Sequence, residues 1–296
     1  MVSHILPFSR NGFMEAKLQS GSRISVSGVQ IKHLLRLQKN RFELAASGGG
    51  YILKPAGSGS FLFPELLAAN EHLTMQAASQ VFDLKTAPNA FMLLSDNSPA
   101  YITKRFDRTS TGTPLPVEDF AQIAGKSSET GGPDFKYNSS YEEIGNLIRK
   151  YVSAPELELE KFFRLVLFNY LISNGDAHLK NFSLLRNDEF GDYLLSPAYD
   201  LLCTRLHLPN ESDTALDLFA DGYESEGYKA GSKYLREDFE ELGRRLGLHE
   251  DSVQTIINDY IHKSEDLKDL TEKSFLPAEL KKQYISLYNE KVRRFM

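Results

Sequence analysis

The most constraining feature of the chain is an apolar segment of helical length that stops abruptly. Residues 158–173 (ELEKFFRLVLFNYLIS) are apolar on nearly every side from Phe162 onward, which is typical of a helix buried in a protein core. The segment ends where Asn174 and Gly175 supply turn residues. We therefore expect Asp176 to lie on a loop that the core anchors directly.

Three polar residues on and after this loop have the order found in protein kinases. Asp176 and Asn181 form a D-x-x-x-x-N spacing, and Asp200 follows the apolar stretch 193–195, which could be a short strand. In phosphoryl transfer one carboxylate orients the acceptor hydroxyl, and oxygen ligands hold Mg²⁺ on the phosphates. Asp176 fits the first role, and Asn181 and Asp200 fit the second. The pattern indicates an ATP-dependent kinase.

A lysine upstream completes this pattern. Residues 51–54 (YILK) predict a strand that ends in Lys54, comparable to the strand whose lysine contacts the α- and β-phosphates in kinases. A glutamate of the following helix usually holds such a lysine. Pro64 suits the first turn of a helix that carries Glu65 and Glu71. We favour Glu71 as the partner of Lys54 because it lies further inside the helix.

Five segments in one order carry a family resemblance. They are residues 24–32 (ISVSGVQIK), 51–55 (YILKP), 105–108 (RFDR), 175–182 (GDAHLKNF) and 197–200 (PAYD). Together they resemble the HipA family of toxin serine/threonine kinases. The resemblance implies an α+β, two-lobed protein-kinase-like fold. Residues 1–106 would form a mixed α/β nucleotide-binding lobe, and residues 107–296 a mainly helical catalytic lobe.

The resemblance also implies roles for individual residues. Asp176 matches the catalytic aspartate, and Tyr199 and Asp200 match the metal-binding pair. Ser25 matches the serine that is autophosphorylated in the family, and Ser27 is a second candidate in the same loop. The expected cofactors are ATP and Mg²⁺. The expected ATP contacts are Ser27, Gly28, Val29, Gln30, Ile31, Lys32, Lys54, Lys104, Arg105, Phe106, His178, Leu179, Lys180, Asn181, Tyr199 and Asp200. We expect His178 to be structural, because Asp176 already fills the position of the base.

The partners expected from the resemblance belong to a toxin–antitoxin system. Only residues 1–23 precede Ile24, and both Ser25 and Ser27 are serines, so the chain resembles the short HipT type. This type implies a separate HipS-like small protein and a HipB-like DNA-binding antitoxin. The implied substrate is an aminoacyl-tRNA synthetase, tryptophanyl or glutamyl, whose phosphorylation arrests translation. The net charge of −6 gives no broad basic face, so direct contact with nucleic acid is not expected.

Other readings of the same residues stay open. A small-molecule kinase similar to aminoglycoside phosphotransferases would share the catalytic loop, and a catalytically silent binding module would share only the fold. A cytoplasmic location without membrane contact is predicted, because the chain has one cysteine, Cys203, no signal pattern in residues 1–13 and no membrane-length apolar run.

The rest of the chain divides into irregular and helical parts. Residues 109–116 and 127–140 are polar and contain Gly or Pro, and residues 209–233 are acidic with little periodicity, so all three are predicted to be surface loops where a protein substrate could dock. Apolar residues at three- and four-residue spacing predict helices over 238–246, 251–262 and 277–295.

Overall fold

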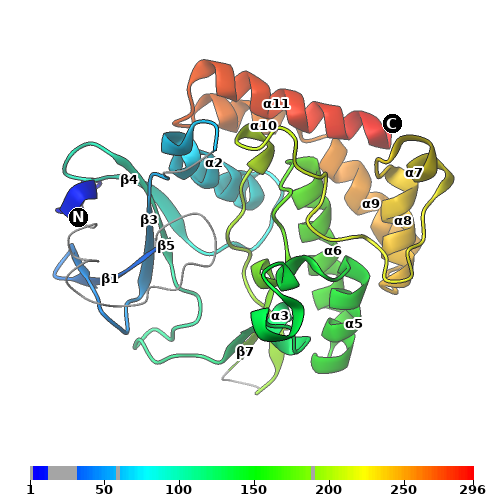
Figure 1. The fold of residues 1–296 in the computed structure, drawn as a ribbon, viewed down its shortest axis with the longest axis horizontal. Coiled ribbons are helices and arrows are strands. Elements are labelled where there is room, and N and C mark those ends of the chain that lie inside the picture. Colours follow the sequence, from blue (N-terminus) through cyan, green and yellow to red (C-terminus); the bar gives the residue numbers. More distant parts are fainter. Residues whose placement is uncertain (1–2, 13–31, 58–60, 188–190) are drawn as a thin grey trace.

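The computed structural model describes residues 3–12, 32–57, 61–187 and 191–296 (Figure 1). A sheet lies on one side of the molecule and most helices lie on the other, with α2 between them. The predicted phosphate loop falls outside the described residues. This applies to the expected sites at Ser25, Ser27, Gly28, Val29, Gln30 and Ile31.

The sheet near the N-terminus is antiparallel and has the strand order β2-β1-β3-β5-β4. Its strands are β1 (His33–Gln38), β2 (Arg41–Leu44), β3 (Tyr51–Pro55), β4 (Asn89–Leu93) and β5 (Pro99–Lys104). The predicted strand at Tyr51 is therefore the central one. In a central strand both neighbours fix the backbone, so the side chain of Lys54 has a well-defined direction.

The two faces of this sheet belong to different cores. Side chains alternate between the faces along a strand. Leu53, Ala100 and Ile102 belong to a small core with Leu6, whose backbone N–H donates to Leu93 on strand β4. Tyr101 points to the opposite face and joins the main core of the protein. Lys54 pairs with Tyr101 in the ladder and lies on this second face.

Helix α2 (Leu67–Gln80) follows a 3₁₀ turn, η1 (Pro64–Leu66). Proline opens this turn, as the sequence predicts, but the α-helix begins only at Leu67. Glu65 therefore lies in the 3₁₀ turn η1, and Glu71 lies in the helix α2. Of the 14 residues in α2, ten are buried. This extent of burial indicates that α2 packs between the sheet and the helices that follow (Figure 1).

The remainder of the chain is mainly helical and contains a second, three-stranded sheet, β6-β7-β8. Its strands, β6 (Val117–Asp119), β7 (Ser183–Arg186) and β8 (Tyr193–Leu195), are too short to show alternation, and only β8 is expected from the sequence. The helices are α3 (Phe120–Ile123), α4 (Ser128–Gly131), α5 (Tyr141–Tyr151), α6 (Pro155–Leu171), α7 (Glu226–Gly231), α8 (Arg236–Arg245), α9 (Glu250–Ile261), α10 (Ser264–Glu272) and α11 (Ala278–Val292). Short 3₁₀ turns are η2 (Phe135–Tyr137), η3 (Leu179–Asn181), η4 (Thr204–Leu206) and η5 (Arg293–Phe295).

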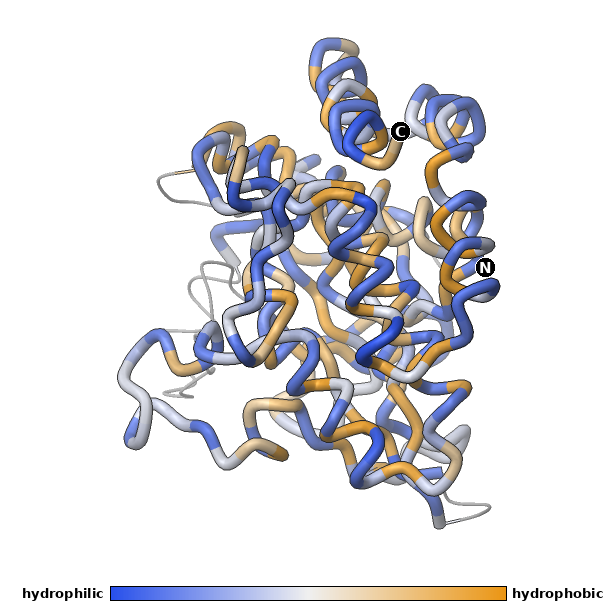
Figure 2. Tube along the Cα trace, turned by 90° about the vertical axis from the view of Figure 1, so that its right-hand side faces the viewer, coloured by the Kyte–Doolittle hydropathy of each residue, from blue (hydrophilic) through white to orange (hydrophobic). Residues whose placement is uncertain are grey.

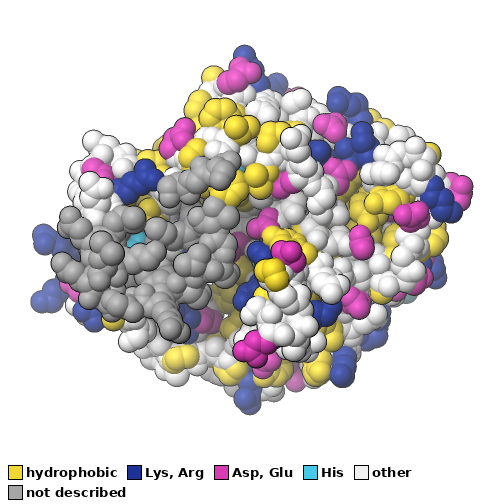
Figure 3. All heavy atoms as spheres, in the orientation of Figure 1, with side chains coloured by type: hydrophobic (Ala, Val, Ile, Leu, Met, Phe, Trp, Pro, Cys, Tyr) yellow, Lys and Arg dark blue, Asp and Glu magenta, His cyan; other side chains and the backbone are white. Residues whose placement is uncertain are grey.

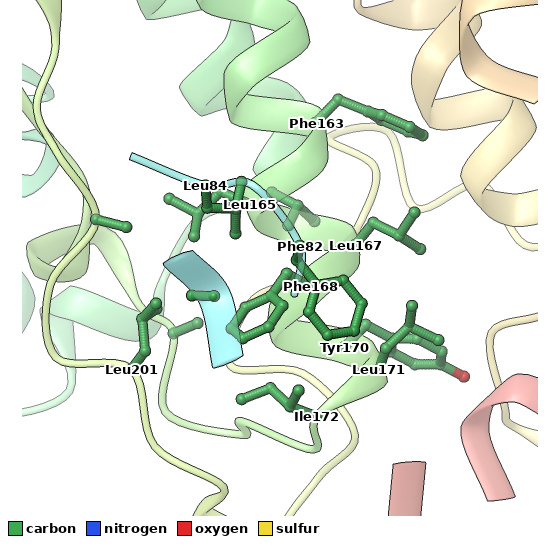
Figure 4. Packing of buried hydrophobic residues seen from close by; sticks show 14 of the residues in the cluster. Phe82, Leu84, Phe163, Leu165, Leu167, Phe168, Tyr170, Leu171, Ile172 and Leu201 are labelled. Carbon is green, nitrogen blue, oxygen red and sulfur yellow. The ribbon is translucent and has the colours of Figure 1, made fainter. Parts of the chain in front are cut away.

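Helix α6 is the centre of the main core, as its apolar sequence predicts. Phe162, Phe163, Leu167, Phe168 and Leu171 are completely buried. In Figure 4 the ring of Phe82, which follows α2, lies beside Phe168, and the ring centroids are 5.0 Å apart. The tube in Figure 2 shows apolar residues gathered inside the molecule and polar residues along the outer faces of the helices. The core thus fixes the end of α6, from which the Asp176 loop leaves.

The predicted helices near the C-terminus correspond to α8, α9 and α11, with ends shifted by one to three residues. The loop expected over 127–140 contains the short elements α4 and η2. No helix among the described residues combines the length and the apolar content that crossing a bilayer requires.

Candidate functional site

Most of the expected site residues that the structure describes line a cleft made of two adjoining cavities, of about 250 and 450 Å³. Lys32, Lys54 and Asp200 line both cavities. Residues 104–106, at the end of β5, are called the linker, and the cavity that they line is the linker-side cavity. The second is the acceptor-side cavity, because it is lined by Asp176, the residue expected to orient the acceptor hydroxyl. Figure 3 shows charged side chains of both signs beside a hollow near the middle of this face.

Lys54 joins the sheet to the rest of the cleft. Its Nζ lies 2.5 Å from Oε1 of Glu71 on helix α2, and it also contacts Oδ1 of Asp200. Lys54 and Glu71 are each only 4% exposed. Of the two glutamates considered from the sequence, Glu71 is the one in contact. Strand alternation explains this contact, because it directs Lys54 toward the face that α2 covers.

The charges of this cluster favour an ionised pair of Lys54 and Asp200. Burial opposes the charge on Lys54, but the two carboxylates outweigh it and the pKa of Lys54 lies above its ordinary value. Burial also acts to raise the pKa of Asp200, yet Lys54 and Lys32 hold it well below its usual range. Burial raises the pKa of Glu71, against the attraction of Lys54. Asp200 therefore carries a negative charge at neutral pH.

Asp200 is held from both sides by lysines. Nζ of Lys32 lies 3.1 Å from Oδ2 of Asp200, while Lys54 contacts Oδ1. The backbone of Asp200 has φ of 55°, in the left-handed region that asparagine and aspartate enter more readily than most residues. Such a conformation persists only where surrounding contacts impose it. Here the contacts with the two lysines fix the carboxylate in the cleft.

The loop that carries Asp176 is tied to the end of α6 by side-chain hydrogen bonds. Nδ2 of Asn174 donates to Oδ1 of Asn169, at 2.7 Å, and the N–H of Gly175 donates to Oγ1 of Thr204, also at 2.7 Å. The hydroxyl of buried Tyr141 donates to the carbonyl of Ala177. These bonds leave the Asp176 side chain half exposed, at the surface of the acceptor-side cavity.

Asn181 lines the same cavity as Asp200, and its side-chain amide is bonded to the loop that carries Asp176. Its Oδ1 accepts the N–H of His178 at 3.1 Å. His178 and Leu179 themselves are buried and line neither cavity. Burial lowers the pKa of His178 to about 4, so the imidazole is neutral at pH 7, and Nε2 can accept from Nζ of Lys136 at 2.8 Å.

Lys180 and Tyr199 lie on the linker side. The hydroxyl of Tyr199 donates to the carbonyl of Lys180 at 2.9 Å, and its ring centroid lies 5.4 Å from that of Phe106. Nζ of Lys180 lies 3.7 Å from Oδ2 of Asp119. The apolar side chains of Ile52, Ala87 and Val117 complete the walls of this cavity. A flat apolar ring system with polar edges suits such a space.

The backbone N–H groups of residues 104 and 105 are engaged in hydrogen bonds with neighbouring segments. The N–H of Lys104 donates to Pro88 and that of Arg105 donates to Gly50. Among the described residues no acceptor is found for the N–H of Phe106. The Arg105 side chain is held by Asp107, with Nε 2.8 Å from Oδ1. The N–H of Phe106 and backbone carbonyl groups are therefore the groups of residues 104–106 that remain for a ligand in this cavity.

The oxygen atoms of Asn181 and Asp200 in the acceptor-side cavity are ligands that fit Mg²⁺. Magnesium prefers hard oxygen ligands and commonly takes one or two from the protein and the others from phosphates and water. Asp200 is ionised and Asn181 has an amide oxygen, and both line the acceptor-side cavity. Because lysines contact both oxygens of Asp200, a metal ion there would share this carboxylate with Lys54 or replace Lys32.

Three of the unexpected residues that line the acceptor-side cavity contact the loop that carries Asp176. The hydroxyl of Tyr137 donates to Oδ1 of Asp176 at 2.6 Å, Lys136 contacts His178, and Glu211 packs against Gly175. All three come from segments that the sequence predicts as irregular loops. A loop has no periodicity that reports which of its residues turn inward, so only the proposed docking role of these loops pointed to them.

Comparison with known proteins identifies a family. Residues 24–267 match the HipA-like C-terminal domain. A Haemophilus influenzae protein named "Putative kinase" is 29% identical over 92% of this chain and 82% of its own length. Two Sinorhizobium fredii proteins, also named putative kinases, are 31% and 30% identical over 71% and 72% of this chain. The chain spans 52% of the length of each of these two.

Solved structures agree on the fold. HipA in a complex of the Shewanella oneidensis toxin–antitoxin proteins HipA and HipB with operator DNA has a TM-score of 0.71 at 19% identity, over 98% of this chain and 71% of that one. The Helicobacter pylori proinflammatory kinase CtkA has a TM-score of 0.55 at 13% identity, over 88% and 90%. The prediction of a kinase-like α+β fold is confirmed.

Proposed function

Because this chain belongs to the HipA-like C-terminal domain family, we propose that it is an ATP-dependent kinase that phosphorylates serine or threonine on a protein substrate. One observation carries the proposal. Lys54 contacts both Glu71 and Asp200 in a cleft that also contains Asp176 and Asn181. Kinase chemistry requires this set of groups, since catalysis of phosphoryl transfer consists mostly of positioning and of charge neutralisation.

Each residue has a distinct task in this proposal. Asp176 accepts the proton of the acceptor hydroxyl and orients it. Lys54, held by Glu71, binds the α- and β-phosphates of ATP. Asn181 and Asp200 would hold Mg²⁺, which supplies positive charge to the phosphate oxygens when bound. The N–H of Phe106, with carbonyl groups of Lys104 and Arg105, binds the base.

Further contacts with ATP are assigned by the family pattern. Lys32 lies at the end of the phosphate loop and its contact with Asp200 supports a position close to the phosphates. We assign the loop Ser27, Gly28, Val29, Gln30 and Ile31 to the phosphates, and Lys180 and Tyr199 to the linker side. His178 and Leu179 are buried and support the loop that carries Asp176. Autophosphorylation at Ser25 or Ser27 is part of the proposal.

The proposed partners are those suggested by the family. Because the chain has a net charge of −6, contact with DNA is assigned to a partner and not to the chain itself. We propose an aminoacyl-tRNA synthetase, tryptophanyl or glutamyl, as the substrate and arrest of translation as the result. The structure of the Shewanella oneidensis relative contains HipB and operator DNA, which supports a HipB-like partner for this chain. A HipS-like small protein is the second proposed partner. The boundary between a nucleotide-binding and a catalytic part is proposed at residues 106 and 107.

The test is transfer of labelled phosphate. Purified protein is incubated with γ-labelled ATP, Mg²⁺ and a bacterial lysate. A labelled protein band, absent with Asp176→Gln and Asp200→Asn, is the expected result. Asp269→Asn, an exposed aspartate on α10, serves as the matched control and should label as the wild type does. Label in small molecules would indicate a small-molecule kinase, and no label would indicate a silent binding module.

A further inference from the structure

Tyr137 lies where an acceptor hydroxyl is expected. Its Oη donates to Oδ1 of Asp176 at 2.6 Å, a short hydrogen bond to a carboxylate. A general base must lie within hydrogen-bond reach of the proton that it removes, about 2.6–3.2 Å between heavy atoms. The Tyr137 hydroxyl meets this criterion toward the residue to which we assign the base role. Tyr137 also lines the acceptor-side cavity together with Lys54, Asn181 and Asp200.

The catalytic loop itself holds Tyr137 in this position. The tyrosine ring meets the ring of His178 edge to face, with centroids 5.2 Å apart. The preceding residue, Lys136, has its Nζ 2.8 Å from Nε2 of His178 and 4.7 Å from the Tyr137 ring centroid. The N–H of Tyr137 donates to Asp134 within the turn η2. Several independent contacts therefore place this side chain.

The phenol is in the correct protonation state to act as an acceptor. Burial and the neighbouring Asp176 raise the pKa of Tyr137 above its ordinary value, so the group keeps its proton until a base removes it. At 36% exposure the side chain is also open to the cavity.

We propose that Tyr137 is a phosphorylation site that the chain modifies in cis. This inference rests on the proposed kinase function and adds to its serine or threonine substrates one tyrosine of the chain itself, whose hydroxyl is held at the proposed base. The bond from Oη of Tyr137 to the γ-phosphorus of ATP forms as the bond from that phosphorus to the β,γ-bridging oxygen breaks. The phenolic proton passes to the carboxylate of Asp176, and ADP leaves with the electron pair of the broken bond. The products are ADP and one phosphotyrosine per chain.

The phosphate adds about 1.5 to 2 negative charges next to Asp176. The phosphotyrosine cannot keep the hydrogen bond to this carboxylate, because it has lost the proton that it donated. The nearest described cation on the same turn is Lys136. Because a phenol accepts one phosphoryl group, labelling of Tyr137 should stop at one phosphate per chain. The added charge and the lost proton should displace the modified side chain from Asp176.

The experiment is mass spectrometry of the peptide that contains Tyr137 after incubation of the purified chain with Mg²⁺ and ATP. We expect phosphotyrosine at 137, rising to one per chain at a rate that stays constant over a tenfold range of protein concentration. The matched controls are Tyr151 and Tyr223, which are 45% and 43% exposed and should stay unmodified. Asp176→Gln should abolish the modification.

A mixing experiment tests the cis geometry. Asp176→Gln retains Tyr137 but lacks the base, whereas Tyr137→Phe retains the base but lacks the acceptor. Incubated together, the two variants should give no phosphate at 137. Phosphate there would show transfer between chains and would overturn the proposal. Unchanged melting temperatures of both variants show that loss of labelling does not come from unfolding.

The outcomes also separate this inference from the function on which it rests. If a lysate protein is labelled in an Asp176-dependent reaction while Tyr137 stays unmodified, the inference is overturned and the kinase function stands. If neither the lysate nor Tyr137 is labelled, both fail. Phosphate on Tyr137 that persists with Asp176→Gln would overturn the inference, because another group would then be acting as the base.

Discussion

Gly175 and Glu211 are packed so closely that any side chain at position 175 would force its neighbours to move. A Cβ on Gly175 would lie 2.6 Å from Cδ of Glu211 and 2.7 Å from the carbonyl oxygen of Ser212. The second neighbour is backbone and cannot rotate away. The residue that precedes Asp176 is thus pressed against the opposite wall of the acceptor-side cavity.

Gly175→Ala should therefore lower both stability and activity. Overpacking at a tight site costs about 1–3 kcal/mol, and a small displacement of the Asp176 carboxylate would slow phosphoryl transfer by tenfold or more. Chemical denaturation and a labelled-ATP assay measure the two effects. Gly231→Ala, where a Cβ meets no atom within 4 Å, is the control and should change neither. Wild-type activity of Gly175→Ala would mean that the loop position is not critical.

Lys54 offers a way to separate structure from chemistry. Lys54→Met leaves Glu71 buried without its cation, and breaking a buried ion pair in this way costs about 3–5 kcal/mol. Replacing both partners, as in Lys54→Met with Glu71→Leu, should restore much of that stability, because no buried charge remains unpaired.

Activity should not return with stability in the double variant, since the proposed contact of Lys54 with ATP is still missing. Denaturation curves and phosphoryl transfer are measured on the same three proteins. A stable and active double variant would contradict the assignment of Lys54 to the phosphates.

The sequence predicts the parts of this site that belong to regular elements. The apolar run of α6 places Asp176, and the strand at Tyr51 places Lys54, because burial and alternation are local properties of the sequence. The choice of Glu71 over Glu65 rests on its place further inside the predicted helix, and the structure places Glu71 in α2 and Glu65 in the turn before it.

The remaining parts depend on irregular segments. Tyr137 reaches Asp176 across 39 positions of sequence, and Glu211 reaches Gly175 from a segment without periodicity. Strands β6 and β7, of three and four residues, pair across a still longer separation, with Asp119 opposite Ser183 and Val117 opposite Leu185. Such contacts are fixed by the packing of the whole chain, so no local sequence pattern predicts them.

We expect Glu211 to make the stability of the protein depend on pH. Burial, opposed by the hydrogen bond from Thr204, raises its pKa from 4.5 to about 7. A group that binds its proton more tightly in the folded state stabilises the fold at low pH, and this contribution is lost as the pH rises through the folded pKa. The free energy of unfolding should therefore fall between about pH 4.5 and 7, by up to about 3 kcal/mol from this group.

The check is denaturation of the wild type and of Glu211→Gln at several pH values. The difference in stability between the two should change over this interval and level off above it. Glu265→Gln, whose side chain is 84% exposed, is the control and should follow the wild type throughout. Parallel curves for Glu211→Gln and the wild type would show that Glu211 titrates normally.

Asp213 ties the C-terminal turn η5 to the segment beside the catalytic loop. Nζ of Lys291 lies 2.6 Å from Oδ1 of Asp213, NH1 of Arg205 lies 2.8 Å from the same oxygen, and Arg294 contacts Oδ2. Burial acts to raise the pKa of Asp213, but these cations hold it at about 2. The carboxylate thus neutralises a cluster of cations of which Lys291 is almost fully buried.

Asp213→Asn should lower the free energy of unfolding by about 3 kcal/mol at neutral pH, because it leaves buried Lys291 without its counter-charge. A carboxylate with a depressed pKa stabilises the fold above its ordinary pKa of 3.8 and loses this effect as the pH falls toward 2. The gap between the wild type and the variant should therefore close below about pH 4.

Hydrogen exchange should quicken in residues 204–213 and 293–295 of the variant at pH 7, whereas β1 and β2, on the far side of the molecule, should keep their wild-type protection. Faster exchange spread evenly over all these regions would instead indicate global destabilisation without a local link at Asp213.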